Sequence, residues 1–277
     1  MIVCKSPAEL ERMRAANGLV ADVLVELRGL VAPGVTTAEL DAFAERRVRG
    51  AGGEPAFKGY HGFPATLCTS VNEEVIHGIP GPRALCEGDI VSIDLGVVLG
   101  GFYGDAAITV PVGRISEEAA ELLRVTDEAL HLGIEEARVG RRVSDIGHAV
   151  QRHVEAGGFS VVREFVGHGV GILLHEEPQV PNYGPPGRGA RLSEGMVLAV
   201  EPMVNLGRPA VRVLEDGWTA VTRDRSLSAH FEHTVAVTRE GPLVLTARGD
   251  ERFDEVLARA GYATADGVET RWRKTTR

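Results

Sequence analysis

The sequence predicts an α+β domain built from two related halves, in each of which helical stretches come before antiparallel strands. The first indication is a repeated phrase: EGDIVSID at 87–94 matches EGMVLAVE at 194–201 in its opening Glu-Gly, its apolar centre and its closing acid. The second follows in the same order, because Asp105 opens DAAITV and Glu232 opens EHTVAV. Two such coincidences, each preceded by helical sequence, favour an internal duplication. The alternative is two unrelated buried hairpins with acids near their turns.

The stretch 87–105 predicts a hairpin with an acid on each strand. Apolar residues alternate with polar ones along 90–95, which is typical of a strand with one polar face. If the hairpin turns at Leu99-Gly100, Asp94 and Asp105 lie directly opposite each other, with Cβ atoms roughly 5 Å apart. Two carboxylates this close repel each other unless they share a proton or hold a cation. A hard divalent cation suits such oxygen donors, and a bridging carboxylate suits two metal ions about 3.5–4 Å apart.

Composition excludes several other classes of protein. The 277 residues suffice for one large or two small domains, and shares of 44% hydrophobic and 25% charged residues are ordinary for a globular protein. The formal net charge of −9 argues against broad nucleic-acid affinity. Cys4, Cys68 and Cys86 are odd in number and form no CxxC motif, so neither a disulfide framework nor a zinc ribbon is expected. No apolar run is long enough to span a membrane, and we expect a cytoplasmic protein.

Four helices are predicted from capping residues. Ser6-Pro7-Ala8-Glu9 is a capping box, so a helix is expected from there to about residue 30. A capping box at 36–39 starts a second helix, which should stop at residue 50. Ser116 should cap a third helix reaching about Arg138, and Ser144 a fourth that ends at Gly157-Gly158.

Strands are expected in both halves, around a loop at 51–64 that is rich in glycine and aromatic residues. The expected strands are 66–71, the hairpin within 87–110, and then 160–166, 196–203, 209–214, 218–222, 230–238 and 242–247. From Arg248 onward we expect one amphipathic helix and a basic end at 271–274. The domain is placed at 1–247, with halves of about 1–112 and 113–247, and 248–277 is a helical and basic extension.

His168 is a candidate metal ligand because glycines flank it in GHGVG. Such glycines let the backbone approach a ligand closely. A single histidine between a strand and a loop is often only a hydrogen-bonded core residue, but here two aspartates and two glutamates accompany it. No Arg or Lys flanks these four acids within two residues. One imidazole and four carboxylates form a plausible set of ligands for two cations of the Mn, Fe, Co or Zn type.

Several motifs in the chain resemble those of one peptidase family. They are HGIP at 77–80, IDLG followed by GD, then GHG, HEEPQVPNYG, EGMVLAVEPM, DGWT and DRSLSAHFEHT. In order and spacing these are similar to the type I methionine aminopeptidases, over roughly residues 5–247. The resemblance implies the pita-bread fold, a pseudo-twofold pair of α/β halves around a curved antiparallel sheet. The expected activity is metal-dependent removal of the initiator methionine from nascent proteins whose second residue is small.

The resemblance also implies a ligand set for two divalent ions. Asp94 chelates one metal ion, Asp105 and Glu232 bridge both, and His168 with Glu201 completes the second. A bridged metal pair lowers the pKa of bound water enough to supply hydroxide near neutrality. Glu201 is also expected to take the proton from that water. The physiological metal among Co, Mn, Fe and Zn is not specified by these ligands.

Two further histidines are implied as catalytic and substrate-binding residues. By resemblance, His175 stabilises the oxyanion or the tetrahedral intermediate, and His77 contacts the amide nitrogen or the next residue. From the residues alone, His77 is an ordinary turn histidine before Gly-Ile-Pro. Asn72 and Ser228 match positions that in some relatives hold a monovalent cation through backbone oxygens.

The substrate pocket is expected to be apolar and about as long as a methionine side chain. The matching positions are Phe57, Tyr60, Phe63, Cys68, Leu174 and Trp218. Each of these residues, taken singly, is as well explained by core packing. Phe57 stands where the family often has a small residue, Leu174 replaces an aromatic one, and Ile-Leu at 172–173 replaces a pair that contains Arg. These departures affect the shape of the pocket rather than the metal chemistry.

Two alternatives differ in function. A proline-specific aminopeptidase of the same fold normally carries an additional N-terminal domain and lacks the pocket pattern of Cys68 and Trp218. A non-catalytic ribosome- or RNA-binding relative would have lost metal ligands, whereas this chain keeps all five. The type I subtype follows from the short distance between His168 and Glu201, which leaves no room for the helical insertion of type II relatives.

The expected partners are the N-termini of nascent polypeptides and, transiently, the ribosome exit region. Neither a membrane nor a sequence-specific nucleic acid is expected, and the family implies a monomer. The basic end of the chain is either a solvated tail or a contact with ribosomal RNA.

Overall fold

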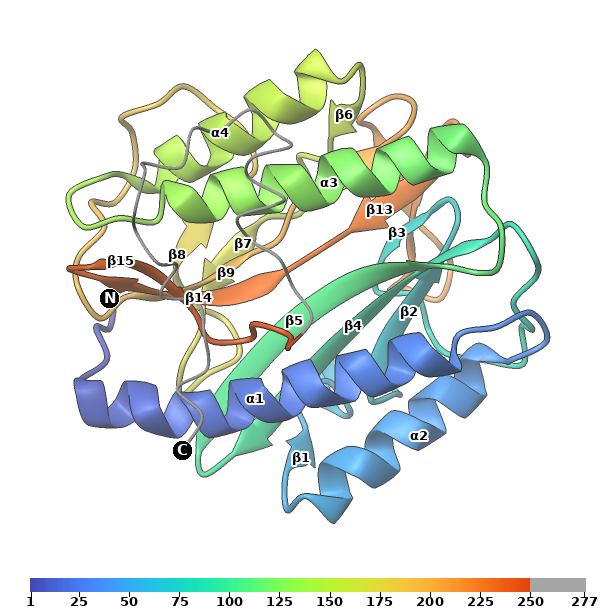
Figure 1. Cartoon of the computed structure of the whole chain (residues 1–277), viewed down its shortest axis with the longest axis horizontal. Coiled ribbons are helices and arrows are strands. Elements are labelled where there is room, and N and C mark those ends of the chain that lie inside the picture. The colour runs from blue at the N-terminus through green and yellow to red at the C-terminus, as the bar shows by residue number, and fades with distance from the viewer. Residues whose placement is uncertain (250–277) are drawn as a thin grey trace.

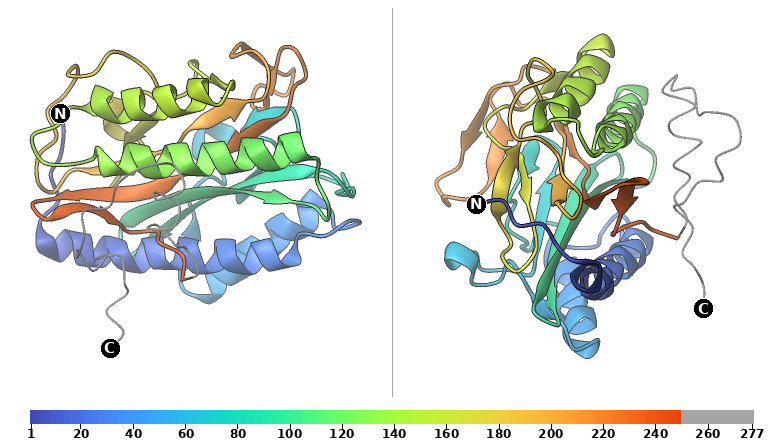
Figure 2. Two further views of the ribbon diagram at one scale, coloured as in Figure 1. Left: turned by 45° about the horizontal axis from the view of Figure 1, so that its top comes forward. Right: turned by 90° about the vertical axis from the view of Figure 1, so that its left-hand side faces the viewer.

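Residues 1–249 fold as two pairs of helices on opposite sides of a layer of antiparallel strands (Figure 1). The computed structural model describes residues 1–249. The helices are α1 (Pro7–Leu30), α2 (Thr37–Gly50), α3 (Glu117–Glu135) and α4 (Val143–Ala156). Helices α1 and α2 run along one side of the strands and α3 and α4 along the other, as the turned views also show (Figure 2). No helix within these residues is long and apolar enough to cross a membrane.

In the described part of the chain, all strand pairs are antiparallel and the strands form four sheets. The first contains β1 (Glu54–Pro55), β4 (Ile90–Leu99), β2 (Leu67–Val71) and β5 (Phe102–Pro111). The second sheet has five strands, in the spatial order β15 (Gly241–Val244), β14 (His233–Thr238), β9 (Val197–Val200), β7 (Gly167–Gly169) and β8 (Glu176–Val180). The smaller sheets are β13 (Ser228–His230) with β10 (Met203–Asn205) and β6 (Ser160–Val161), and β11 (Val211–Val213) with β12 (Ala220–Thr222) and β3 (Glu74–Ile76). A short 3₁₀ turn, η1 (Tyr60–Gly62), precedes β2.

Apolar helix faces pack against the strands in two main cores. One core joins α1 and α2 to β2, β4 and β5 and includes Leu24, Val48 and Ile93. The other joins α3 and α4 to β9, β13 and β14 and includes Leu130 and Leu198. Burial of such side chains is the main favourable term in folding. The helices thus hold the strands in place on two sides. Strand side chains that do not pack against the helices can then form a site.

Three of the four helix starts agree with their predicted caps, and the fourth does not. Ser6 and Thr36 form the two capping boxes, and the Ser116 side chain accepts a hydrogen bond from the Ala119 N–H. Ser144, however, lies inside α4, and Arg142 is the capping residue, with its N–H donating to Asp145. The Ser144 hydroxyl instead accepts a hydrogen bond from the Arg188 N–H, so this side chain fastens a neighbouring loop.

Several other boundaries differ from the prediction. Helix α3 ends at Glu135, before the expected Arg138, whose guanidinium donates to the Glu135 carbonyl at the end of the helix. The expected strand 160–166 pairs only over β6. The expected strands 196–203 and 230–238 are each divided into two strands that belong to different sheets. The predicted C-terminal helix lies outside the described residues.

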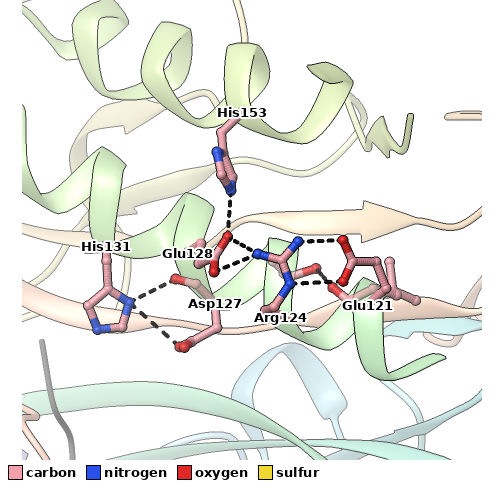
Figure 3. Close-up of polar contacts among 8 residues, drawn as sticks. Glu121, Arg124, Asp127, Glu128, His131 and His153 are labelled. Atoms are coloured by element: carbon pink, nitrogen blue, oxygen red, sulfur yellow. Dashed lines mark hydrogen bonds and ion pairs between the residues drawn. The ribbon is translucent and has the colours of Figure 1, made fainter. Parts of the chain in front are cut away.

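A buried carboxylate joins the two helices of the second pair (Figure 3). Glu128 of α3 is 1% exposed, accepts hydrogen bonds from Arg124 at 2.6 and 2.7 Å, and lies 3.0 Å from His153 Nε2 of α4. Arg124 also pairs with Glu121 on the same helix, where both side chains are partly exposed. The guanidinium therefore stays in contact with water, whereas the Glu128 carboxylate depends on its two partners.

We predict that Arg124→Met lowers the free energy of unfolding by about 1–3 kcal/mol, the usual cost of a buried polar group that has lost its partner. Glu121→Gln should change it by no more than about 0.5 kcal/mol, since exposed ion pairs contribute little. Urea unfolding followed by circular dichroism measures both. Adding Glu128→Gln to Arg124→Met should recover part of the loss, because the charge is removed; equal costs for Arg124→Met and Glu121→Gln would contradict this account.

Candidate active site

Five predicted ligands converge from four separate parts of the chain. Asp94 lies on β4, Asp105 on β5 and His168 on β7. Glu201 follows β9 directly, and Glu232 directly precedes β14. Because β9 pairs with both β7 and β14, these strands bring His168 to the same region as the glutamates. The four carboxylate residues are all buried, with exposed fractions from 2% to 8%.

Both glutamates lie where a strand passes from one sheet to another. The chain leaves β9 at Glu201-Pro202 and enters β10, and it leaves β13 at 231–232 and enters β14. At these two breaks the Phe231 N–H donates to the Pro202 carbonyl, and the Glu232 N–H donates to the Ala107 carbonyl of β5. Neither glutamate lies within a regular strand. The backbone at the junction between two sheets therefore determines where each side chain points.

The predicted register of the first hairpin is wrong by two residues. Asp105 is paired with Gly96, and Asp94 is paired with Ala107. The turn consists of Gly100 and Gly101 with φ of 60° and 81°, a two-residue turn of the kind that matches the twist of a hairpin. Asp94 and Asp105 are therefore diagonal neighbours on one face, and their carboxylates still interact.

Gly96 has a role in the shape of the site because it lies opposite Asp105. A Cβ atom at this position would come within 2.5 Å of the Phe57 ring and 2.9 Å of the Ala56 Cβ. The missing side chain thus lets Phe57 pack directly against β4. The loop at 51–64 contributes three aromatic residues to the cavity that the acids also line: Phe57, Tyr60 and Phe63.

His168 is held in the tautomer that a metal ligand needs. Its Nδ1 is 2.9 Å from the Gly169 carbonyl, to which a ring N–H donates. The proton on Nδ1 leaves the lone pair of Nε2 free, as in many metal sites. Nε2 lies 3.4 Å from Glu201 and 3.9 Å from Asp105. One ligand atom from each of Asp105, His168 and Glu232 lies within 4.8 Å of the others, a spacing that can hold a metal ion.

Burial controls the electrostatics of the acids. It raises the pKa of Asp94 to about 7, and it also raises the pKa of Glu201, with Asp94 adding to the effect. The pKa of Asp105 is raised well above its ordinary value by burial and then by Asp94 and Glu201. Burial, followed by the charges of Asp105, Glu201 and Asp94, raises the pKa of Glu232. Each of these pKa shifts expresses a cost of placing negative charge here without a cation.

The donor set fits divalent metal ions. One oxygen each of Asp94, Asp105 and Glu232 is buried without a hydrogen-bond partner in the described part of the chain. Within residues 1–249, no Lys or Arg lies within 4 Å of the four carboxylates; their only such neighbours are His168 and His230. Unpaired buried acids are costly unless a metal ion neutralises them.

A cavity of about 320 Å³ opens beside the acids. Its lining contains all the predicted site residues other than Asn72 and Ser228. They are the five predicted ligands, the two predicted catalytic histidines and the six predicted pocket residues: Asp94, Asp105, His168, Glu201, Glu232, His77, His175, Phe57, Tyr60, Phe63, Cys68, Leu174 and Trp218. Phe63 and Trp218 meet edge to face at 5.1 Å between ring centroids. Cys68 pairs with Asp94 across β2 and β4, and burial raises the pKa of its thiol, which keeps it protonated. The apolar wall and the acids therefore form one continuous site.

Four residues of this lining were not predicted from the sequence: His61, Ile76, Phe165 and Val166. Phe165 and Val166 were assigned to a strand, and the absence of pairing there lets them face the cavity. His230 was also missed; it is 1% exposed and its Nε2 lies 3.8 Å from Glu201. The motif DRSLSAHFEHT contains His230, but its burial against Glu201 follows from the break between β13 and β14.

Asn72 and Ser228 lie side by side, and neither of them lines the cavity. The Ser228 N–H donates to the Asn72 carbonyl at 2.9 Å, and Asn72 has a positive φ of 59°. The Asn72 side chain is engaged by Asp89 and by the Ile90 N–H. Binding of a monovalent cation here stays a prediction.

A buried ion pair holds the turn that carries Leu174 and His175. Glu176 pairs with Lys5, and both side chains are less than 10% exposed. The other oxygen of Glu176 accepts hydrogen bonds from the Ile172 and Leu173 N–H groups, while these two side chains are exposed. The segment before α1 thus braces the turn from behind. His77 lines the cavity together with His175, and burial, followed by the charge of His175, lowers the pKa of His77 to about 4.

Comparison with known proteins places the chain among metallopeptidases. The model of metallopeptidase family M24 matches residues 11–239. The chain therefore belongs to metallopeptidase family M24. Within this family its similarity is to methionine aminopeptidases: methionine aminopeptidase 1 of Bacillus subtilis (strain 168) is 55% identical over 246 residues, which cover 89% of this chain and 99% of that protein.

Solved structures support the same grouping. The crystal structure of methionine aminopeptidase from Thermotoga maritima matches with a TM-score of 0.88 at 48% identity, covering 90% of this chain and all of that one. The prolidase from Pyrococcus horikoshii OT3 matches with a TM-score of 0.73 at 23% identity and is covered over 65% of its length, so this likeness shows the fold alone. The pita-bread fold expected from the sequence is confirmed.

We predict that metal-free protein loses thermal stability as the pH rises above about 6.5. Burial raises the pKa of Asp94 to about 7, and it also raises the pKa values of the other three acids: Asp105, Glu201 and Glu232. A carboxyl whose pKa is raised by folding stabilises the folded state at low pH, and this stability is lost as the pH passes through the raised value. His168 and His77 have pKa values lowered to about 3 and about 4, so they affect stability only below about pH 6.5, where unfolded histidine takes up a proton.

Added Mn²⁺ should raise the melting temperature, and more strongly at higher pH, because metal ions displace protons from their ligands. Differential scanning calorimetry of chelator-treated and reloaded protein measures this. Asp94→Asn should reduce the slope of stability with pH. Identical slopes with and without metal would contradict the assignment of these acids to a metal site.

Proposed function

We propose that this chain is a type I methionine aminopeptidase, which removes the N-terminal initiator methionine from proteins whose second residue is small. One observation carries the proposal. Four buried carboxylates and His168, without Lys or Arg partners among residues 1–249, line the same cavity as an apolar wall. The acids suit a hydrolytic metal centre, and the wall suits one unbranched apolar side chain.

The cofactors are two divalent ions from the group Co, Mn, Fe and Zn. Asp94 would hold one ion, Asp105 and Glu232 would bridge both, and His168 with Glu201 would hold the second. Carboxylate and imidazole ligands accept all of these metals, so availability decides which one is used. When bound, such ions lower the pKa of water enough to supply a nucleophile near neutral pH.

The side chains around the acids supply the remaining steps. Glu201 accepts the proton of the attacking water, for which its buried position beside Asp94 and its raised pKa are suited. His175, exposed toward the cavity, donates a hydrogen bond to the oxygen of the tetrahedral intermediate. His77, half-buried against Phe165 and Trp218, contacts the amide nitrogen or the next residue.

The methionine side chain would be surrounded by a wall of apolar residues that are shielded from water. Four of them are each less than 10% exposed: Phe57, Phe63, Cys68 and Leu174. Tyr60 and Trp218 complete this wall at its half-buried side. Phe57, which packs against Gly96, belongs to the same cavity lining as the acids. A narrow apolar pocket favours methionine over charged or β-branched side chains, because those would lose hydration or clash.

The partners follow from the substrate. The expected substrates are the N-termini of nascent polypeptides. The enzyme would meet them transiently near the ribosome exit, in the cytoplasm. The chain is expected to act as a monomer. A proline-specific aminopeptidase shares the fold, but the relatives at high identity and nearly full coverage are methionine aminopeptidases. A non-catalytic ribosome- or RNA-binding relative is not favoured, since all five ligands are present.

Hydrolysis of Met-Ala-Ser beside Ala-Pro-Ala tests the proposed function. Metal-free protein titrated with Mn²⁺, Fe²⁺ or Co²⁺ should release methionine from the first peptide only, and the titration ranks the metals. Cleavage of the proline peptide instead would keep the metal site but contradict the pocket assignment. Metal binding with activity on neither peptide would contradict the function.

Two variants separate the roles of ligand and catalyst. Asp105→Asn removes a bridging charge and should abolish both hydrolysis and tight metal occupancy, measured by inductively coupled plasma analysis. His175→Ala should retain metal but lower kcat by about 10²–10³, as expected for loss of a group that stabilises an oxyanion. Full activity of Asp105→Asn, or loss of metal from His175→Ala, would show that these roles are assigned wrongly.

A further inference from the structure

Tyr60 is placed to do more than line the pocket. Its hydroxyl lies 2.7 Å from Nδ1 of His175, although the two residues are 115 positions apart in the chain. Their ring centroids are 5.3 Å apart. Within residues 1–249 the His175 ring has no other hydrogen bond, and the residue is exposed toward the cavity. Among the described residues, this hydrogen bond is therefore the one polar contact that orients the exposed ring.

The loop that carries Tyr60 is tightly closed. The Gly59 N–H donates to the Phe63 carbonyl, the Tyr60 N–H to the Phe57 carbonyl, and the Phe63 N–H back to the Tyr60 carbonyl. His61, the next residue, has a φ of 47°, a conformation that L residues adopt at a cost. A loop held this firmly presents the Tyr60 hydroxyl at a defined position.

The chemistry of the two groups decides the direction of the hydrogen bond. A neutral imidazole nitrogen with a lone pair is a strong acceptor, whereas a phenol oxygen is a better donor than acceptor. Burial, followed by the nearby Tyr103, raises the pKa of Tyr60, so the phenol keeps its proton. The O–H of Tyr60 thus donates to Nδ1 of His175, and the proton of the imidazole resides on Nε2.

The neighbouring ring limits how His175 can turn. His168 meets His175 edge to face with centroids 4.3 Å apart, on the side of the proposed metal ligands. Tyr60 occupies the Nδ1 edge of the ring. Nε2, at the opposite edge of the imidazole, is left without a partner among the described residues and is available to a substrate in the cavity.

We infer that Tyr60 is a positioning residue that fixes His175 as its Nε2–H tautomer, so that the imidazole can donate a hydrogen bond to the reacting carbonyl oxygen. This inference rests on the proposed function. It gives Tyr60 a second role, separate from its contact with the methionine side chain. Without the phenol O–H, the ring would populate the other tautomer, in which Nε2 is an acceptor and repels an oxyanion.

Tyr60→Phe tests this inference because it keeps the aromatic ring and removes only the hydroxyl. We expect kcat to fall about 10-fold or more, the usual cost of losing a group that orients a functional histidine, while KM for Met-Ala-Ser changes little. Tyr103→Phe is the matched control: Tyr103 packs against the same apolar cluster but does not line the cavity, and its variant should keep both constants.

Nitrogen-15 spectra of the imidazole rings give a readout that does not depend on hydrolysis. In Zn²⁺-loaded protein, with His175 assigned by comparison with His175→Gln, the proton should reside on Nε2 and Nδ1 should be unprotonated. In Tyr60→Phe the His175 signals should shift toward a mixture of tautomers. In Tyr103→Phe they should stay as in the unaltered protein.

The outcomes separate this inference from the proposed function. If the unaltered protein hydrolyses Met-Ala-Ser but its His175 carries the proton on Nδ1, or Tyr60→Phe leaves the tautomer unchanged, the inference is wrong and the function stands. If kcat/KM of Tyr60→Phe falls only because KM rises, Tyr60 contacts the substrate without positioning His175, and the inference is wrong. If no peptide is cleaved while the tautomer depends on Tyr60, the positioning is right and the function is wrong.

Discussion

Four carboxylates buried side by side are the constraint on which the rest of the structure depends. Their mutual repulsion and their separation from water both oppose folding, so the backbone must hold them in place. Asp94 and Asp105 are carried by the long β4–β5 hairpin, and Glu201 and Glu232 by chain segments that bond to each other and to β5. Helices packed behind the strands on two sides supply the apolar burial that offsets this cost. Because the fold already holds the carboxylates close together, cations can bind there without a rearrangement of the backbone.

Two histidines of the site are oriented by hydrogen bonds at the same ring nitrogen, with opposite results. At His168, Nδ1 donates to the Gly169 carbonyl and Nε2 keeps a lone pair directed at the acids. At His175, Nδ1 lies against the Tyr60 hydroxyl, and in our inference Nε2 carries the proton. A lone pair suits a metal ligand, whereas an N–H suits an oxyanion. The two rings touch each other, yet their partners assign them different chemistry.

The parts of the chain that shape the cavity come from segments far apart in sequence. Gly96 makes room for Phe57, and Lys5 braces Glu176 beneath the turn that carries His175. Neither Gly96 nor Lys5 lines the cavity, and each acts by placing a residue that does. Substitutions at such supporting positions would alter specificity or rate without touching a substrate.

The sequence by itself determined the helix starts at Ser6, Thr36 and Ser116 and the acidic pattern, and its family motifs indicated most, though not all, of the residues that line the cavity. Capping, alternation and motif spacing are local properties, so they could be recognised without a structure. The hairpin register was missed because it depends on which two residues form the turn, and these are Gly100 and Gly101 rather than Leu99 and Gly100. The cap of α4 was missed because a loop from elsewhere in the chain engages Ser144. Only the tertiary structure decided that the strands break at Glu201 and Glu232, and that Tyr60 meets His175, because these features arise where sheets and loops distant in sequence come together.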